Sequence, residues 1–255
     1  MEKDKIIKTF NFLEKSIKIL LSFAIKFVEK IIDKIDNISP SENIKKRVIS
    51  ALVLIPVAIY AICFAQNLFI FLAIVLTILM TVEWLDLTKS AAEKNKWHLI
   101  GLFYIAFPIF CVIKLRIMNS NIVLWMFFVI WATDIFAFFS GKTFGGKKLA
   151  PKISPNKTWS GLAGGVGASM FIGLLSSVMF PGGIFFFIFM SAILALIEQA
   201  GDLFESKIKR TFGVKDSGNI IPGHGGILDR LDGLMFTAPA VLFIITIFSD
   251  KFFNI

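Results

Sequence analysis

The sequence has few of the residues that build metal or disulfide frameworks, and few charges for its length. Among 255 residues there are two cysteines and two histidines, and only 18% of the residues are charged. Cys63 and Cys111 lie inside apolar runs, with no CxxC pattern and no neighbouring histidine. Neither a disulfide framework nor a zinc site is therefore predicted, and both cysteines are expected to be small packed side chains.

The shortage of charge accompanies an excess of apolar residues. Hydrophobic residues make up 56% of the chain and the mean hydropathy is +0.78, whereas soluble domains are about 45–50% apolar. This composition excludes an ordinary soluble domain and predicts an integral membrane protein. The net charge of +9 then indicates basic loops that face an anionic leaflet or anionic substrates, rather than nucleic acid.

A signal peptide is not predicted, because lysines interrupt residues 1–45 and no small-residue cleavage site follows them. Apolar residues instead recur every three or four positions from Ile6 to Ile35. This spacing predicts an amphipathic helix in an extension that covers residues 1–40. Such a helix lies either in the membrane interface or against the membrane domain of the same protein.

Uncharged runs through the rest of the chain predict an all-α, polytopic membrane domain over residues 45–255. About seven transmembrane helices are expected, plus or minus two, because a bilayer core of ~30 Å needs ~20 helical residues. The expected spans are about 48–65, 67–82, 99–113, 122–139, 159–180, 184–200 and 233–248. With the amino terminus inside, most cations fall in cytoplasmic loops, the two longest being 140–158 and 205–232.

Four carboxylates fall toward the cytoplasmic ends of the predicted spans. A carboxylate at membrane depth is costly, so it is a functional candidate by default. The four residues are Glu83, Asp134, Glu198 and Asp202.

A polar face continues from Asp202 along the predicted helix. Ser206 follows four residues later, and Lys209 and Arg210 three and four residues after that, so a continuous helix brings them to one side. One interpretation is that Asp202 ligates a hard divalent cation while the other side chains meet phosphate oxygens. The alternative is an Asp–Lys pair within the helix at a membrane surface.

The segment before the last span combines carboxylates, cations and a glycine turn. Asp229 and Asp232 are three residues apart, and two such carboxylates repel unless a cation lies beside them. Mg²⁺ fits, since it takes one or two carboxylates together with substrate phosphates. Gly225 and Gly226, beside His224, allow backbone N–H groups to approach phosphate.

The loop 140–158 resembles a P-loop only superficially. Before Gly141-Lys142-Thr143, the position that requires a glycine holds Phe136, so the P-loop assignment fails. Lys157 precedes an apolar run, where a lysine and the N–H groups of a helix start are expected to meet an anion.

These residues resemble the phosphatidate cytidylyltransferase family, whose members make CDP-diacylglycerol from CTP and phosphatidic acid. The resemblance extends over about residues 45–250, and SKIKRTFGVKDSGNIIPGHGGILDRLD matches the family's signature at every defined position. Those positions are Ser206, Lys209, Arg210, Lys215, Asp216, Pro222, His224, Gly225, Gly226, Asp229, Arg230 and Asp232. The chain departs from the family pattern at two positions. Ser160 stands where an acidic residue or glutamine is common, and Phe138 stands where a tyrosine is common.

The resemblance also implies roles for individual residues. Asp202 and Asp229 would hold Mg²⁺, alone or with a second cation, and Asp216 and Asp232 are further candidates. Ser206 and His224 would orient a phosphate or a metal-bound water. Phosphates would be bound by Lys157, Lys209, Arg210, Lys215 and Arg230.

The expected function is therefore CMP transfer from CTP to phosphatidic acid at the cytoplasmic side of a bacterial inner membrane. Membrane lipids are expected partners, and glycines at Gly161, Gly164 and Gly167 favour close helix packing and a homodimer. Two alternatives stay open. One is a CTP-dependent kinase of a lipid alcohol, and the other is a transporter of anionic solutes.

Overall fold

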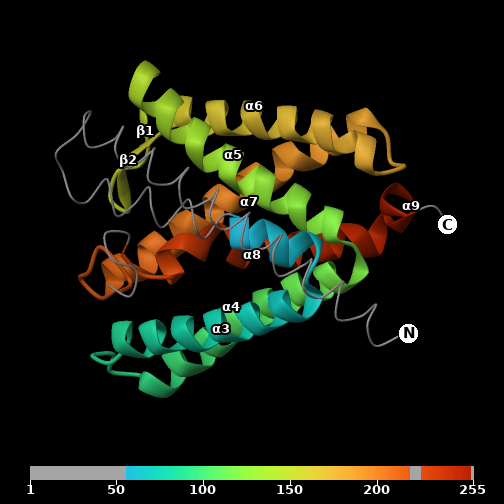
Figure 1. The fold of residues 1–255 in the computed structure, drawn as a ribbon. Helices are drawn as coiled ribbons and strands as arrows, with labels where there is room; N and C mark the ends of the chain where they lie inside the picture. Colours follow the sequence, from blue (N-terminus) through green and yellow to red (C-terminus); the bar gives the residue numbers. More distant parts are fainter. Residues whose placement is uncertain (1–55, 219–224, 254–255) are drawn as a thin grey trace, which may run out of the picture. The chain divides into compact units, whose positions relative to one another are not determined.

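Long apolar helices make up most of the computed structural model, which describes residues 56–218 and 225–253 (Figure 1). Within these residues six helices are long and apolar enough to cross a membrane. An apolar run in lipid forms a helix because its backbone hydrogen bonds are then satisfied internally. The helices are α3 (Gln66–Leu87), α4 (Lys94–Met118), α5 (Ser120–Phe144), α6 (Trp159–Ser176), α7 (Ile184–Thr211) and α8 (Leu228–Ile247).

These helices confirm the predicted all-α, polytopic fold. The predicted spans from residue 67 onward correspond to α3–α8, one for one. Residues 56–63, at the end of the first predicted span, are also helical. The predicted amphipathic extension, residues 1–40, lies outside the described residues.

Short elements lie between and after the long helices, and some fall within the two predicted loops. Strands β1 (Lys148–Ala150) and β2 (Ser154–Thr158) form an antiparallel hairpin after α5. Because α7 continues to Thr211 and α8 starts at Leu228, helices also occupy both ends of the segment 205–232. A 3-10 turn (η1, Ser177–Met179) follows α6, and a short helix (α9, Ser249–Phe252) follows α8.

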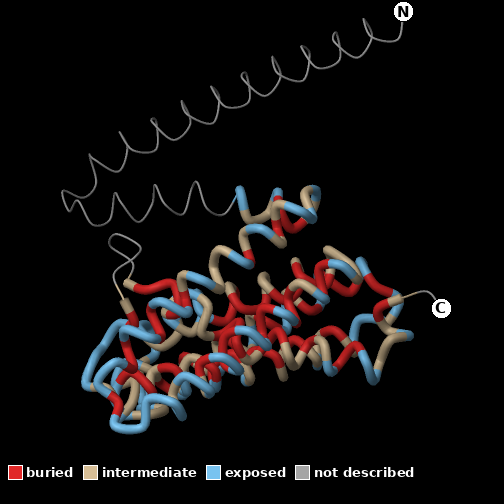
Figure 2. The backbone as a smooth tube through the Cα atoms, turned by 90° about the horizontal axis from the view of Figure 1, so that it is seen from below, coloured by how far each residue is buried: buried red, intermediate tan, exposed pale blue. Residues whose placement is uncertain are grey.

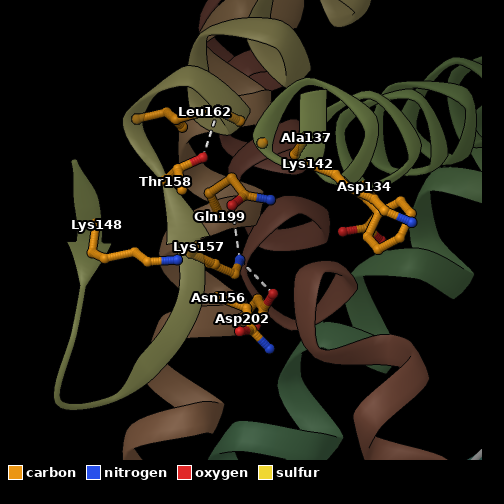
Figure 3. A pocket seen from close by; sticks show the side chains of 13 residues that line it. Asp134, Ala137, Lys142, Lys148, Asn156, Lys157, Thr158, Leu162, Gln199 and Asp202 are labelled. Atoms are coloured by element: carbon orange, nitrogen blue, oxygen red, sulfur yellow. Dashed lines mark hydrogen bonds and ion pairs between the residues drawn. The ribbon is translucent and has the colours of Figure 1, made fainter. Parts of the chain in front are cut away.

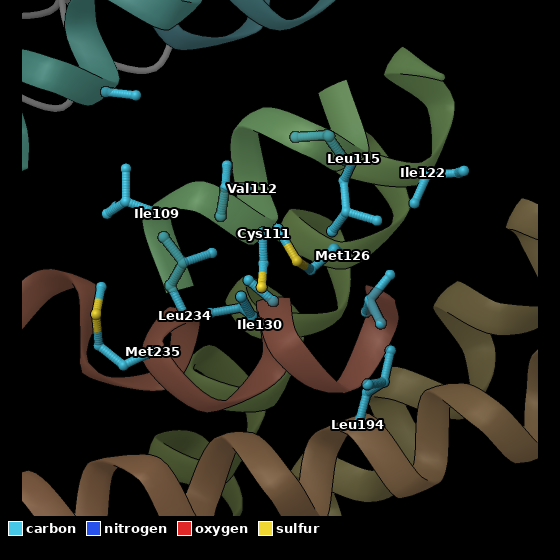
Figure 4. Packing of buried hydrophobic residues seen from close by; sticks show 14 of the residues in the cluster. Ile109, Cys111, Val112, Leu115, Ile122, Met126, Ile130, Leu194, Leu234 and Met235 are labelled. Carbon is cyan, nitrogen blue, oxygen red and sulfur yellow. The ribbon is translucent and has the colours of Figure 1, made fainter. Parts of the chain in front are cut away.

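The helices pack side by side around an apolar interior. The chain divides into the units Met1–Val57 and Ala58–Ile255, and all labelled helices belong to the second. There α3 packs on α4, α4 on α8, α8 on α7, α7 on α6 and α6 on α5. Figure 2 shows the buried residues concentrated on the inner sides of these helices. Figure 4 shows the α4–α5–α8 contact, where Cys111, Met126 and Leu234 meet.

The cysteines and the outer surface agree with the predictions made from composition. Cys111 is fully buried in the apolar interior and Cys63 is half-buried, as expected of packed small side chains. Large apolar side chains such as Phe71, Phe103 and Phe171 are exposed on α3, α4 and α6. Exposed apolar surface of this extent is typical of a surface that contacts another apolar phase, here lipid.

Glycines let α6 approach its two neighbours closely. A Cβ atom built on Gly161 would lie 2.7 Å from the Ala137 carbonyl oxygen of α5, and one built on Gly164 would overlap Ser140. Close packing was therefore predicted correctly for both. Gly167 meets no described neighbour, since a Cβ there has nothing within 4 Å among the described residues, so its predicted packing stays a prediction. The α6–α7 contact instead depends on Gly173, where a Cβ would lie 2.3 Å from the Phe187 carbonyl oxygen.

The replacement Gly173→Ala tests this packing. Its methyl group has to push α6 away from the α7 backbone, and overpacking of this kind costs about 1–3 kcal/mol of unfolding free energy. The measurement is thermal unfolding of the purified protein in detergent. Gly167→Ala is the matched control and should leave stability unchanged or raise it by up to about 1 kcal/mol, because alanine is the better helix former. Equal stability of the two variants would contradict the packing argument.

Candidate active site

The polar connections between helices gather at one end of the unit Ala58–Ile255. Figure 1 shows the β1–β2 hairpin, the α3–α4 connection and the ends of α7 and α8 at this end. A hydrogen bond joins two of these parts, since Arg210 Nε of α7 donates to the Ile153 carbonyl oxygen of the hairpin at 3.3 Å. The loops that were predicted to share one side of the membrane are thus together.

A pocket of about 480 Å³ opens at this end between α5, the hairpin, α6 and α7 (Figure 3). One part of its wall is apolar and includes Ala137, Phe138 and Leu162. The other part carries charge and hydrogen-bonding groups. These are Asp134, Lys142, Lys148, Asn156, Lys157, Thr158, Gln199 and Asp202.

Lys157 lies at the centre of the polar wall. Its ammonium forms an ion pair with Asp202 and donates to Gln199 Oε1 at 2.8 Å. The Asp202 carboxylate also accepts from Ser206 Oγ at 3.2 Å, one turn along α7. Strand β2 therefore supplies the cation and α7 the carboxylate. Of the two interpretations of Asp202, the pairing with a lysine of its own helix does not occur, because its lysine comes from another element.

Thr158 joins β2 to α6 and ends the strand at the pocket. Its Oγ1 accepts from the Gly161 N–H at 3.1 Å, which caps the start of α6. This bond helps to hold Lys157, the preceding residue, at a defined position over α7.

Two more carboxyl groups lie beside Asp202. Asp134 of α5 lines the pocket and interacts electrostatically with Asp202 and Glu198. Glu198 is fully buried, and its Oε2 accepts from Gln199 Nε2 at 3.0 Å. Among the described residues, none donates a hydrogen bond to its Oε1. A buried polar atom left unpaired calls for a further partner, such as an ion or water.

Asp229, in the first turn of α8, is held by donors on three segments. Its Oδ2 accepts from the Ser217 N–H at 2.9 Å, from Ser217 Oγ at 3.0 Å and from the Gly226 N–H at 2.9 Å. Its Oδ1 is paired with the Lys209 ammonium of α7. Both oxygens of this carboxylate are thus engaged.

Lys209 extends this network into the helix bundle. The side chain is only 9% exposed, and its ammonium also pairs with Glu205 Oε1 at 3.1 Å, one turn earlier on α7. Glu205 Oε2 lies 3.5 Å from the hydroxyl of Tyr104 on α4. A buried ammonium between two carboxylates, with a further hydrogen bond behind them, satisfies the requirement that buried charges be paired.

Close packing of α7 on α8 brings the two groups of residues together. A Cβ on Gly201 would lie 2.9 Å from the Asp232 carbonyl oxygen, and a Cβ on Gly233 would lie 2.8 Å from Glu198 Cγ. The backbone carbonyl of Asp232 on α8 therefore lies against the residue that precedes Asp202. Asp202 and Asp229 themselves pair with different lysines, Lys157 and Lys209, so their shared role at a metal stays a prediction.

The remaining predicted residues are placed around this centre. Arg210 donates to the carbonyl oxygens of Ile153 and Val214. Lys215 and Asp216 line a second pocket, of about 470 Å³, beside the α3–α4 connection. Arg230 is an exposed residue of α8. His224 and Pro222 lie outside the described residues, so their predicted roles stay predictions.

Comparisons with known proteins identify the family. The sequence profile of the Cytidylyltransferase family matches residues 94–248. The chain belongs to this family. A relative named phosphatidate cytidylyltransferase from Rickettsia felis is 44% identical over 80% of this chain and 92% of the relative. A relative of the same name from Rickettsia bellii is 44% identical over 79% of this chain and 90% of the relative. Another, from Brucella abortus, is 43% identical over 68% of this chain and 63% of the relative.

The resemblance drawn from the signature residues is thereby confirmed, but the sequence analysis missed several residues of this cytidylyltransferase-family site. Glu205 is one of them, and its position four residues before the predicted Lys209 on one helix could have revealed the pairing. Tyr104, Gln199 and Ser217 carried no comparable signal. They reach the site only because α4, α7 and the segment before α8 pack together.

The replacement Lys209→Met tests the buried network. It leaves Glu205 and Asp229 without their shared cation, and removal of one partner of a buried ion pair costs about 3–5 kcal/mol. We expect a loss of this size in the free energy of unfolding in detergent. Lys207→Met, at an exposed position of α7, is the control and should change stability by less than about 0.5 kcal/mol. A Lys209→Met protein as stable as this control would show that the network is not needed for folding.

Proposed function

We propose that this protein transfers CMP from CTP to phosphatidic acid, which yields CDP-diacylglycerol and pyrophosphate. The observation that carries the proposal is the 44% identity over 92% of a relative that bears the name of this activity. The geometry supports it, because carboxylates and lysines meet in one pocket at the polar end of membrane-crossing helices.

The reaction asks for positioning and charge neutralisation rather than for a general base. A phosphate oxygen of phosphatidate, already an anion, forms a bond to the α-phosphorus of CTP. The bond from the α-phosphorus to the bridging oxygen breaks, and pyrophosphate leaves with the electron pair. Transfers of this kind depend mainly on cations that stabilise the charge of the transition state.

The pocket offers suitable groups for both substrates. Lys142, Lys148 and Lys157 provide cations for phosphate oxygens, and Phe138 of the apolar wall is also exposed on the outer surface. We assign Lys157 to the triphosphate, because it is the lysine that the hairpin already holds against Asp202. The acyl chains of phosphatidate then lie along the apolar wall.

A divalent cation is part of the proposal. In the residues that the structure describes, no group of three or more acidic, histidine or cysteine side chains is arranged to hold a metal ion. The donors fit Mg²⁺ nonetheless, since it is commonly bound by one or two carboxylates together with substrate phosphates. Two observations support the fit, namely the 23% exposure of the Asp202 side chain at the pocket and the unpaired Glu198 Oε1.

Asp202 and Asp229 are the proposed ligands. To bind Mg²⁺, Asp202 would give up its contact with Lys157, and Asp229 would give up its contact with Lys209. When bound, Mg²⁺ would neutralise charge on the triphosphate. The displaced ammonium groups would remain near the phosphates.

The location and assembly of the protein are also proposed. The α3–α4 connection, the hairpin and the last turns of α7 lie at one end and are rich in cations (Figure 1), which favours placement of this end on the cytoplasmic side of a bacterial inner membrane. We also retain the homodimer as a proposal, because glycines on membrane helices allow close approach between copies.

The first test is the identity of the products. Purified protein in detergent, supplied with CTP, phosphatidic acid and Mg²⁺, is expected to release pyrophosphate and CDP-diacylglycerol in equal amounts. Chromatography of products from cytidine-labelled and phosphate-labelled CTP measures both. Formation of CDP together with a phosphorylated lipid would instead identify a lipid kinase, and the proposal would be abandoned.

The second test concerns the metal ligands. Asp202→Asn is expected to raise the Mg²⁺ concentration for half-maximal activity by about 10- to 100-fold, because a neutral amide is a weaker ligand. Asp229→Asn should act in the same direction if Asp229 is the second ligand. Chelation of Mg²⁺ should abolish turnover of the wild type. An unchanged Mg²⁺ dependence in Asp202→Asn would remove that residue from the metal site.

A further inference from the structure

A carboxylate on α3 contacts the start of α8, although nothing in the signature includes it. Glu83 lies in the last turns of α3 and is only 3% exposed. It also lies outside residues 94–248, which match the family profile. From the sequence, Glu83 was predicted only to be a functional candidate, because a carboxylate at membrane depth is costly.

Both oxygens of Glu83 accept hydrogen bonds from the segment around the start of α8. Oε1 accepts from the Ile227 N–H at 2.8 Å, and Oε2 from the Leu228 N–H at 2.9 Å and from Ser217 Oγ at 3.4 Å. The first N–H groups of a helix have no partner within the helix, and they favour negative charge. Ile227, at the N-cap position, supplies no side-chain cap of its own. Glu83 therefore caps α8 from a different helix.

Two glycines make room for this carboxylate. A Cβ on Gly218 would lie 2.8 Å from Glu83 Oε1, and a Cβ on Gly226 would lie 2.8 Å from Glu83 Oε2 and 2.0 Å from Ser217 Oγ. Neither position can carry a side chain unless Glu83 moves away. The glycine at Gly226, which the sequence analysis linked to phosphate, is thus also required for the approach of Glu83.

The segments that Glu83 holds are the same ones that hold Asp229. Ser217 donates from its N–H and Oγ to Asp229 Oδ2, and Gly226 donates to the same oxygen. Ser217 Oγ lies between the two carboxylates, 3.4 Å from Glu83 and 3.0 Å from Asp229. A movement of Glu83 would therefore change the position of Asp229 and of its partner Lys209.

We propose that Glu83 is a positioning residue for the transfer reaction, which fixes the start of α8 and, through Ser217, the orientation of Asp229. It touches neither substrate. The inference rests on the proposed function, because the effect on turnover presumes that Asp229 takes part in it. The charge is needed, since each carboxylate oxygen accepts from a backbone N–H, whereas a glutamine has one acceptor oxygen and would direct its NH₂ group at the other N–H.

The experiment compares Glu83→Gln with the wild type. Residues that orient a reacting group typically change activity by about 10- to 100-fold, and we expect a fall of this size in kcat with KM for CTP close to that of the wild type. Glu83→Asp should recover part of the loss, because it retains both oxygens. Wild-type kcat in folded Glu83→Gln would overturn the proposal.

A double-mutant cycle separates positioning from a purely structural role. If Glu83 acts through Ser217, the effects of Glu83→Gln and Ser217→Ala on kcat should combine to less than their product. If the two effects on kcat simply multiply, Glu83 does not act through Ser217 and the proposal is overturned. If Glu83→Gln fails to fold, Ser217→Ala alone decides, since it keeps the two backbone bonds of Glu83 and removes only the hydroxyl between the carboxylates. A normal kcat in that variant refutes the proposal.

Ser191→Ala is the matched control for the loss of a buried hydrogen bond. Ser191 is fully buried on α7 and accepts from Trp125 Nε1 at 2.9 Å, apart from the pocket and the Asp229 network. It should lower the unfolding temperature and leave kcat unchanged. A fall in kcat of the same size as in Glu83→Gln would mean that general destabilisation explains both.

Amide hydrogen exchange tests the geometry without any reaction. Ile227 and Leu228 should exchange faster in Glu83→Gln than in the wild type, because they lose charged acceptors. Unchanged exchange would contradict the capping role. A wild type that forms no CDP-diacylglycerol but shows this change in Glu83→Gln would refute the proposed function and leave the capping role standing.

Discussion

The carboxylate of Asp229 needs a partner for each of its oxygens, because an unpaired charge at the edge of a membrane-embedded bundle is very costly. Lys209 supplies one partner and the segments at Ser217 and Gly226 supply the others. This requirement ties α7, α8 and the residues before α8 into one arrangement. Glu83 extends it to α3, and Glu205 with Tyr104 extends it to α4.

Close helix packing makes this arrangement possible. Gly201 and Gly233 let α7 and α8 approach at the level of Asp202 and Asp232, and Gly161 lets α6 approach α5 beside the pocket. Larger side chains at these positions would separate the carboxylates and widen the pocket. Packing in the apolar interior and the chemistry at its polar end are therefore not independent.

Much of the fold follows from local patterns. The apolar runs that became α3–α8 are long enough to cross a bilayer, and only helices satisfy the backbone there. The β1–β2 hairpin was not expected, because its short strands, such as Ser154–Thr158, have no apolar alternation. Gly161 and Gly164 have their neighbour on α5 and Gly167 has none among the described residues, since the spacing of glycines shows a small-residue face but not which neighbour covers it.

The sequence by itself determined the membrane-crossing helices, the collection of cations at one end and the membership of the family, because hydropathy and a long ordered signature are properties of neighbouring residues. Only the tertiary structure decided the partners. Lys157 with Asp202, Tyr104 with Glu205, and Glu83 with the start of α8 join residues that are 45, 101 and at least 144 positions apart. Such contacts arise from how α3, α4, α7 and α8 pack. A periodicity within one helix reports only residues within a turn or two of each other.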